Sequence, residues 1–191
     1  MIEKFLKAKH WQIFMVTFGL PFLIQIIMMP MTIIGNDPTI MMNVFPVIMI
    51  LFMGGFLGWF WSIGVGLQIK VPNDVKMKVK KFKVFLLIPL VYMLFISISM
   101  GSMFNGAFEN GQVPNPGIIG SIVGIIVPLH LFSMFCIFYC LYFVAKTFKT
   151  VELQREVSFS DFAGEFFMIW FFPIGIWIVQ PKVNKMIEEQ K

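Results

Sequence analysis

The stretch EFFMIWFFPIGIWIVQPKVNK, residues 165–185, decides how many times this chain crosses a membrane. Its uninterrupted apolar part, Phe166–Val179, would extend only about 21 Å as a helix, whereas the hydrocarbon core of a bilayer is about 30 Å thick. Pro173 and Gly175 stand in the middle of it. Because the stretch is short and interrupted, it favours a re-entrant or interfacial segment. A fifth crossing is the alternative, and it would carry Glu165 to membrane depth.

The composition of the chain is that of a membrane protein. Of its 191 residues, 58% are hydrophobic and only 13% are charged, whereas a soluble domain is about 45–50% apolar and about 25% charged. Four further apolar runs are long enough to cross a bilayer as helices: about 11–34, 44–69, 84–103 and 118–145. We therefore expect an all-α integral membrane protein with a single membrane domain over residues 1–191. Its bundle would contain four transmembrane helices plus a fifth apolar, Pro/Gly-broken segment at 162–180.

Lysines indicate the orientation of this bundle. They flank the apolar runs at the N-terminus, six times over Lys70–Lys83, and again after the fourth run, whereas the loops at 35–39 and 105–117 contain no Lys or Arg. Since the cytoplasmic loops of membrane proteins carry the excess of Lys and Arg, this alternation predicts a cytoplasmic N-terminus. The net charge of +5 thus reflects topology, and no basic patch with interleaved aromatic residues points to nucleic acid.

Small residues recur at every fourth position in the second run, and the fourth run carries a shorter version. At about 100° per residue, that spacing keeps them on one slowly drifting face of a helix. Small side chains there let another helix approach closely. We expect a helix-packing face at Gly54, Gly58, Ser62, Gly66, Gly120 and Gly124. The pattern leaves open whether the partner helix belongs to the same chain, to a second copy in a homo-oligomer or to another membrane protein.

Three polar side chains at membrane depth or at its edge are candidates for a function: Gln25, His130 and Glu165. An amide or imidazole is costly in lipid unless it is hydrogen-bonded, so Gln25 and His130 should face other helices. Cys136 and Cys140 share the run with His130, but on a helix they point about 80–120° away from it. We therefore expect no metal site, no other cofactor and no disulfide framework.

Two interpretations of Glu165 are open. Ser158, with Asp161 three residues later, fits a capping box at the start of a helix, and acidic side chains near that start suit the helix macrodipole. The alternative interpretation places the Glu165 carboxylate in the membrane, paired with a lysine such as Lys146 or Lys149.

The lysine-rich loop after the second run has two interpretations, topology alone or topology together with attraction to anionic headgroups. Each lysine close to an anionic membrane surface gains about 1 kcal/mol. We assign lipid headgroup contacts to Lys76, Lys78, Lys80, Lys81 and Lys83.

Three phrases of the sequence carry a resemblance: WFWSIGVGLQIKVPNDVKMKVKKFKVF (59–85), PLHLFSMFCIFYCLYFVAKTFKTVELQREVSFSDFAGEFF (128–167) and WFFPIGIWIVQPKVNK (170–185). Together they resemble a group of uncharacterised, small polytopic inner-membrane proteins of Gram-negative bacteria. The resemblance covers about half of the chain and implies a bacterial inner-membrane protein with several helices. It implies no activity and no catalytic residues, because none is established for that group.

The sequence gives little support for an enzyme, because it contains no Gly-rich phosphate loop, no Cys/His metal spacing and no Ser/His/Asp arrangement. We expect a non-enzymatic packing, accessory or lipid-interacting protein, in contact with the bilayer and with a membrane-protein partner or a second copy. The alternative is a small transporter or channel component with a polar path through Gln25, His130 and Glu165.

Overall fold

The computed structural model describes residues 2–35, 39–110 and 116–188. These residues form helices and short connections, and no strand occurs among them. In chain order the elements are α1 (Ile2–Lys7), α2 (His10–Phe14), the π-helix η1 (Met15–Gly19), α3 (Leu20–Gly35), α4 (Thr39–Gly66), the 3-10 helix η2 (Leu67–Lys70), α5 (Val79–Asn110), α6 (Pro116–Leu153), α7 (Phe159–Trp170) and α8 (Phe172–Glu188). Residues 36–38 and 111–115 lie outside the described residues. The second lysine-free loop, predicted at 105–117, is shorter than expected, because α5 continues to Asn110 and α6 begins at Pro116.

Four helical stretches are long and apolar enough to cross a membrane: His10–Gly35, Asn43–Lys70, Val79–Ser99 and Val123–Leu153. The all-α membrane bundle expected from the sequence is therefore confirmed.

The last of these helices ends later than its hydropathy suggested. The sequence placed its end near residue 145, but α6 continues to Leu153. The reason is that the polar-looking stretch after Ala145 has a buried face, formed by Thr147, Phe148, Thr150 and Val151. A helix with one inward face keeps its backbone hydrogen bonds even where its other side chains are charged.

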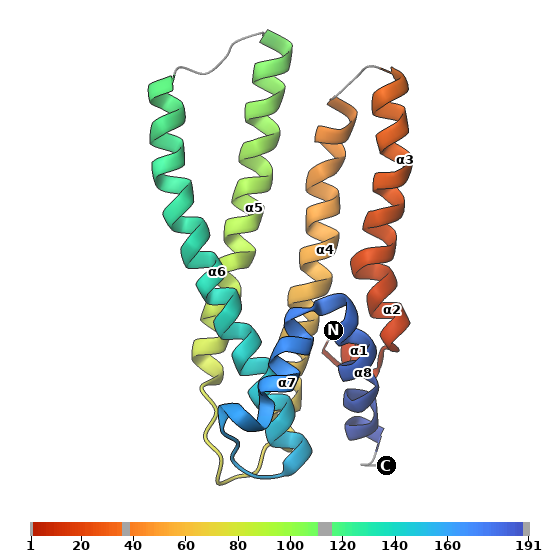
Figure 1. Ribbon diagram of the computed structural model, residues 1–191, viewed down its shortest axis with the longest axis vertical. Helices are drawn as coiled ribbons and strands as arrows, with labels where there is room; N and C mark the ends of the chain where they lie inside the picture. The colour runs from red at the N-terminus through yellow and green to blue at the C-terminus, as the bar shows by residue number, and fades with distance from the viewer. Residues whose placement is uncertain (1, 36–38, 111–115, 189–191) are drawn as a thin grey trace.

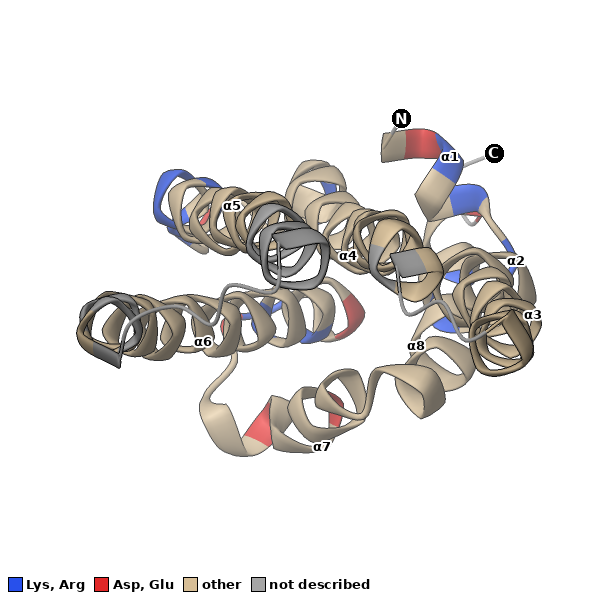
Figure 2. Cartoon of the chain, turned by 90° about the horizontal axis from the view of Figure 1, so that it is seen from above, with Lys and Arg blue, Asp and Glu red and all other residues tan. Residues whose placement is uncertain are grey.

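The bundle has α4 at its centre, where it packs against α3, α5 and α6. Seen from above, α5, α4 and α3 form one row, and α6 and α7 lie beside that row (Figure 2). The connections after η2 and after α6 lie together at the lower end of the molecule, where α7 and α8 also pack (Figure 1). We call this the basic end, because it carries the lysines of residues 70–83 and 146–149.

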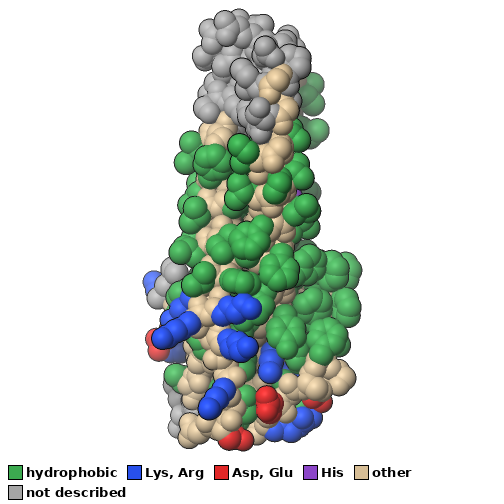
Figure 3. All heavy atoms as spheres, turned by 90° about the vertical axis from the view of Figure 1, so that its left-hand side faces the viewer, with side chains coloured by type: hydrophobic (Ala, Val, Ile, Leu, Met, Phe, Trp, Pro, Cys, Tyr) green, Lys and Arg blue, Asp and Glu red, His purple; other side chains and the backbone are tan. Residues whose placement is uncertain are grey.

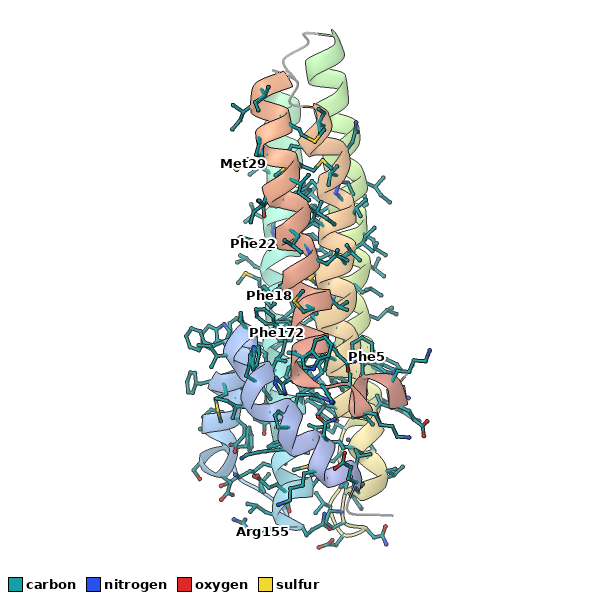
Figure 4. The ribbon with its side chains drawn as sticks, turned by 90° about the vertical axis from the view of Figure 1, so that its right-hand side faces the viewer. Phe5, Phe18, Phe22, Met29, Arg155 and Phe172 are labelled. Carbon is teal, nitrogen blue, oxygen red and sulfur yellow. The ribbon has the colours of Figure 1, made fainter. Side chains whose placement is uncertain are left out.

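The tightest core lies at the basic end. The largest fully buried side chains include Trp59, Phe60, Phe82, Phe148 and Phe162. Further from the basic end, the helices turn large apolar side chains outward, such as Phe22 and Met29 along α3 (Figure 4). Apolar surface of this kind is costly in water and free of that cost in lipid, so it fits a bundle surrounded by a bilayer.

The fifth apolar segment folds as a helical hairpin. α7 ends at Trp170, Phe171 takes φ −79° and ψ 61°, and α8 begins at the next residue. The chain therefore reverses direction, so that the start of α7 and the end of α8 both lie at the basic end (Figure 1). Of the two alternatives from the sequence, the segment takes the geometry that turns back and not that of a straight fifth crossing.

The two residues that interrupt the fifth segment both belong to this turn. Pro173 lies in the first turn of α8, where its missing N–H costs little. A Cβ at Gly175 would overlap the carbonyl oxygen of Met168, so only glycine lets α8 start this close to the end of α7. Phe172 packs the hairpin against the bundle, because its ring centroid lies 5.5 Å from that of Phe18 (Figure 4).

Candidate functional site: the basic end of the bundle

The N-terminal helix α1 packs against small residues of α4. A Cβ at Gly58 would lie 2.9 Å from the ring of Phe5, and one at Gly66 would lie 2.7 Å from a methyl carbon of Leu6. Ser62, between them, is buried and donates its hydroxyl proton to the carbonyl of Gly58, 2.7 Å away. At this part of the packing face the partner is thus α1 of the same chain.

The rest of the expected packing face is open. A Cβ at Gly54, Gly120 or Gly124 would have no described atom within 4 Å. Close contacts occur instead at neighbouring glycines of α4: a Cβ at Gly55 would overlap the methyl group of Thr17, and one at Gly64 would lie 2.6 Å from the ring of Phe82. A partner from outside the chain at the open positions stays a prediction.

An ion cluster joins α6, α7 and α8. Lys149 places its Nζ 2.9 Å from Oε1 of Glu165 and 2.7 Å from Oε2 of Glu152. Lys182 of α8 reaches the other oxygen of Glu152, at 3.1 Å. Glu165 is only 6% exposed, so its charge is compensated inside the protein. Of the two lysines that the sequence offered to Glu165, the structure selects Lys149, whereas Lys146 lies 3.9 Å from Glu156.

The capping box that the sequence predicts at the start of α7 is also present. The backbone N–H of Ser158 donates to the carboxylate of Asp161 at 2.8 Å, and Arg155 adds an ion pair at 2.9 Å. The Arg155 guanidinium and the Ser158 donors lower the pKa of Asp161 to about 2. The two interpretations of Glu165 are therefore compatible, because Asp161 serves the cap and Glu165 serves the ion cluster.

Sequence reasoning missed a buried amide that holds the N-terminus. Gln180 is fully buried. Its Oε1 accepts from the indole N–H of Trp59 at 2.7 Å, and its Nε2 donates to the carbonyls of Phe5 at 3.0 Å and Ala8 at 2.9 Å. Asn184, one turn later, donates to the Ala8 carbonyl at 3.1 Å. Carbonyls at the end of a helix have no partner within it, so α8 caps α1. The available signal was an amide directly after the apolar part of the fifth segment, whereas Gln25 is singled out as an amide in the middle of a run.

The three polar candidates of the sequence do not come together. His130 shares a hydrogen bond of 3.1 Å with the hydroxyl of Tyr92 on α5. Glu165 pairs with Lys149, which lies nineteen residues beyond His130, or about 28 Å along α6. Gln25 is exposed on α3 and forms no hydrogen bond with a described residue, so, contrary to the expectation from the sequence, it does not face another helix of the described chain. These placements do not form one polar path.

An open cavity of about 800 Å³ lies at the basic end, between η2, the end of α6 and α8. Lys70 and Lys182 line it, but Lys70 donates to the carbonyl of Met186 and Lys182 pairs with Glu152. Gln154, also in the lining, has a φ of 51° and donates to the carbonyls of Lys70 and Val151. These side chains therefore fasten η2 and α8 to α6.

The five lysines assigned to lipid headgroups are arranged differently. All five are exposed. Lys80, Lys81 and Lys83 lie in the first two turns of α5, and Lys76 and Lys78 lie just before it. Figure 3 shows lysines of the basic end directly below the hydrophobic surface of the bundle.

No group of three or more His, Cys, Asp or Glu side chains that could hold a metal ion occurs in the described part of the chain. Cys136 and Cys140 are buried and free.

Comparison with known proteins adds no relative, since no family model, no curated protein and no solved structure matches this chain. The class that the fold defines is a polytopic, all-α membrane protein.

Proposed function

We propose that this protein is a non-enzymatic membrane protein that binds the headgroups of anionic phospholipids at its basic end. One observation carries the proposal. Lys76, Lys78, Lys80, Lys81 and Lys83 are all exposed, and none of them forms an ion pair with a described residue. Other cations of the basic end, such as Lys149 and Lys182, have carboxylate partners.

Lys80, Lys81 and Lys83 lie at the start of α5, where their positive charges do not stabilise the helix. Cations near the N-terminus of a helix are opposed by its macrodipole, at about 0.3–1 kcal/mol each, and no acidic residue stands in the first turn of α5. The same dipole attracts an anion to this end of the helix. A phosphate group bound there would interact favourably with both the lysines and the helix.

Aromatic rings hold two of the ammonium groups at the edge of the apolar surface. The Nζ of Lys81 lies 5.0 Å from the ring centroid of Phe85 and 4.8 Å from that of Tyr139. The Nζ of Lys83 lies 5.5 Å from the ring centroid of Trp61. Trp and Tyr side chains concentrate at the boundary between headgroups and hydrocarbon. This arrangement supports placing these cations at the depth of the lipid phosphates.

We further propose that the basic end faces the cytoplasm of a bacterium, with the protein in the inner membrane and its N-terminus cytoplasmic. The distribution of Lys and Arg supports this orientation. The resemblance of residues 59–85, 128–167 and 170–185 supports the location.

The test compares lipid retention by variants with equal net charge. Lys81→Gln with Lys83→Gln removes two unpaired cations, whereas the control, Lys7→Gln with Arg155→Gln, removes two cations that have carboxylate partners. Native mass spectrometry would count phosphatidylglycerol and phosphatidylcholine bound to the protein after purification from mixed vesicles. At about 1 kcal/mol per lysine, the first variant should lose about 30-fold in affinity for phosphatidylglycerol. The control should lose much less.

Two results would overturn the proposal. One is equal retention of phosphatidylglycerol and phosphatidylcholine by the unmodified protein. The other is an equal loss of phosphatidylglycerol in the test and control variants, which would reduce the effect to overall charge.

A further inference from the structure

The hairpin of α7 and α8 carries an exposed apolar surface around its turn. We call this surface the hairpin crown. Between 48% and 62% of each of its residues is exposed. Its members are Phe167, Trp170, Phe171, Ile174 and Trp177. Large apolar side chains gathered in this way mark a surface that another apolar phase covers.

The crown is continuous with the lipid-facing surface of α6. The ring of Trp170 lies 5.1 Å from that of Phe138. Phe135 and Leu131, further along α6 from the basic end, are also exposed. Because α6 is one of the four helices long and apolar enough to span a membrane, the phase that covers its exposed side chains extends onto the crown.

The length of the hairpin matches one leaflet. From Phe162 to Trp170, α7 rises about 13 Å, and from Phe172 to Val179, α8 descends about 12 Å. Half of a hydrocarbon core of about 30 Å is about 15 Å. A hairpin with this apolar height reaches close to the bilayer midplane without crossing it.

Charges are absent from the crown and present at its base. Arg155 and Asp161 form an exposed pair just before and at the start of α7, and Lys182 lies beyond the apolar part of α8. The one acidic residue within the apolar part of α7, Glu165, is buried and paired with Lys149 of α6. The lipid-facing side of the hairpin is therefore apolar down to the level of these charged side chains.

We propose that the α7–α8 hairpin is inserted into the acyl chains of the leaflet at the basic end, with its crown near the bilayer midplane. The C-terminal end of α8 then lies on the same side of the membrane as the lysines of residues 76–83. The occupant of the crown is phospholipid acyl chain. This inference depends on the shape and apolarity of the hairpin and not on headgroup charge, so it can fail or hold independently of the proposed function.

The experiment uses nitroxide spin labels on single cysteines in vesicles, with Cys136 and Cys140 replaced by serine. Labels at Phe171→Cys and Ile174→Cys report on the crown, and Glu188→Cys reports on the end of α8. Ile26→Cys, on the exposed apolar face of α3, is the reference for contact with acyl chains. The labels at the crown should behave like the reference label: oxygen, which dissolves in the acyl chains, should relax them strongly, and a water-soluble nickel complex should relax them weakly. The label at Glu188 should show the reverse.

A membrane-impermeant thiol reagent then tests the side. In sealed vesicles of uniform orientation, Glu188→Cys and Lys76→Cys should react from the same side. Reaction from opposite sides would establish a fifth crossing and overturn the inference. Exposure of both crown labels to the nickel complex would also overturn it. Spin–spin broadening at the crown would show that a second copy covers it in place of lipid, and would overturn it as well.

Discussion

Removal of Lys149 and removal of Glu165 should lower the free energy of unfolding by different amounts, although the two side chains form one ion pair. Lys149→Met leaves Glu165 buried at 6% exposure without its cation, whose Nζ lies 2.9 Å away. Breaking a buried pair in this way costs about 3–5 kcal/mol. Glu165→Gln leaves Lys149 paired with Glu152 at 2.7 Å, and the new amide oxygen still accepts a hydrogen bond. We expect that change to cost about 1 kcal/mol.

The double variant makes the prediction quantitative. Without the carboxylate of Glu165, loss of Lys149 no longer strands a buried charge, and Glu152 keeps Lys182 at 3.1 Å. The coupling energy between the two positions should therefore be about 2–3 kcal/mol. Unfolding in mixed micelles with increasing SDS, followed by tryptophan fluorescence, would measure all four proteins. Lys146→Met is the control, since its partner is 3.9 Å away and largely exposed, and should cost less than about 1 kcal/mol.

Two results would refute this reasoning. Equal losses for Lys149→Met and Glu165→Gln would mean that the carboxylate is not stranded by loss of its cation. A coupling energy close to zero would mean that the two side chains do not interact in the folded protein.

Three other predictions concern the hairpin and the N-terminal helix. Gly175→Ala should lower the free energy of unfolding by about 3 kcal/mol, because the new Cβ would overlap the backbone of Met168. Gly164→Ala has open space around it and should raise the free energy of unfolding by about 0.5–1 kcal/mol. Unfolding of both variants in SDS measures the difference, and similar effects would contradict the geometry. Gln180→Leu should lower the free energy of unfolding by about 2–3 kcal/mol, because it leaves the buried Trp59 indole N–H unpaired and removes the amide hydrogen bonds to the carbonyls of Phe5 and Ala8. Limited proteolysis should cut near α1 faster than in the unmodified protein. The pKa of Asp161, about 2, lies below its ordinary 3.8. The contribution of the Asp161 carboxylate to the stability of the folded protein should therefore be fully present above about pH 4 and lost as the pH falls towards about 2. Thermal melts of Asp161→Asn should lack this pH dependence, and equal losses in both proteins would count against it.

Much of the architecture follows from local features of the sequence. Apolar runs predict membrane helices because a helix pairs its backbone N–H and C=O groups within the same segment, so that its fitness for lipid depends on its own residues. The capping box of Ser158 and Asp161 was equally readable, since its partners are three residues apart. Hydropathy did mislead at the end of α6, where charged side chains on one face conceal a buried face of Thr147 and Val151.

The site depends more on contacts between distant segments. Glu165 had two lysines within reach of its sequence position, and only the rotation of α6 against α7 selects Lys149 over Lys146. Gln180 holds carbonyls that lie more than 170 residues earlier in the chain, which no local pattern reveals. The five unpaired lysines could be named from the sequence, but their lack of carboxylate partners depends on how the bundle packs.

The sequence by itself determined that this is a helical membrane protein, how many long apolar segments it has and where its basic loops lie, because these properties are sums over neighbouring residues. For residues 162–180 it favoured a re-entrant or interfacial segment but left a fifth crossing open, because extending the segment back through Glu165 would make it long enough to span. The tertiary structure decided for the hairpin. The contact of Gly175 with the Met168 backbone, the packing of Phe172 against Phe18, and the pairing of Glu165 with Lys149 are together available only when the chain reverses at Phe171.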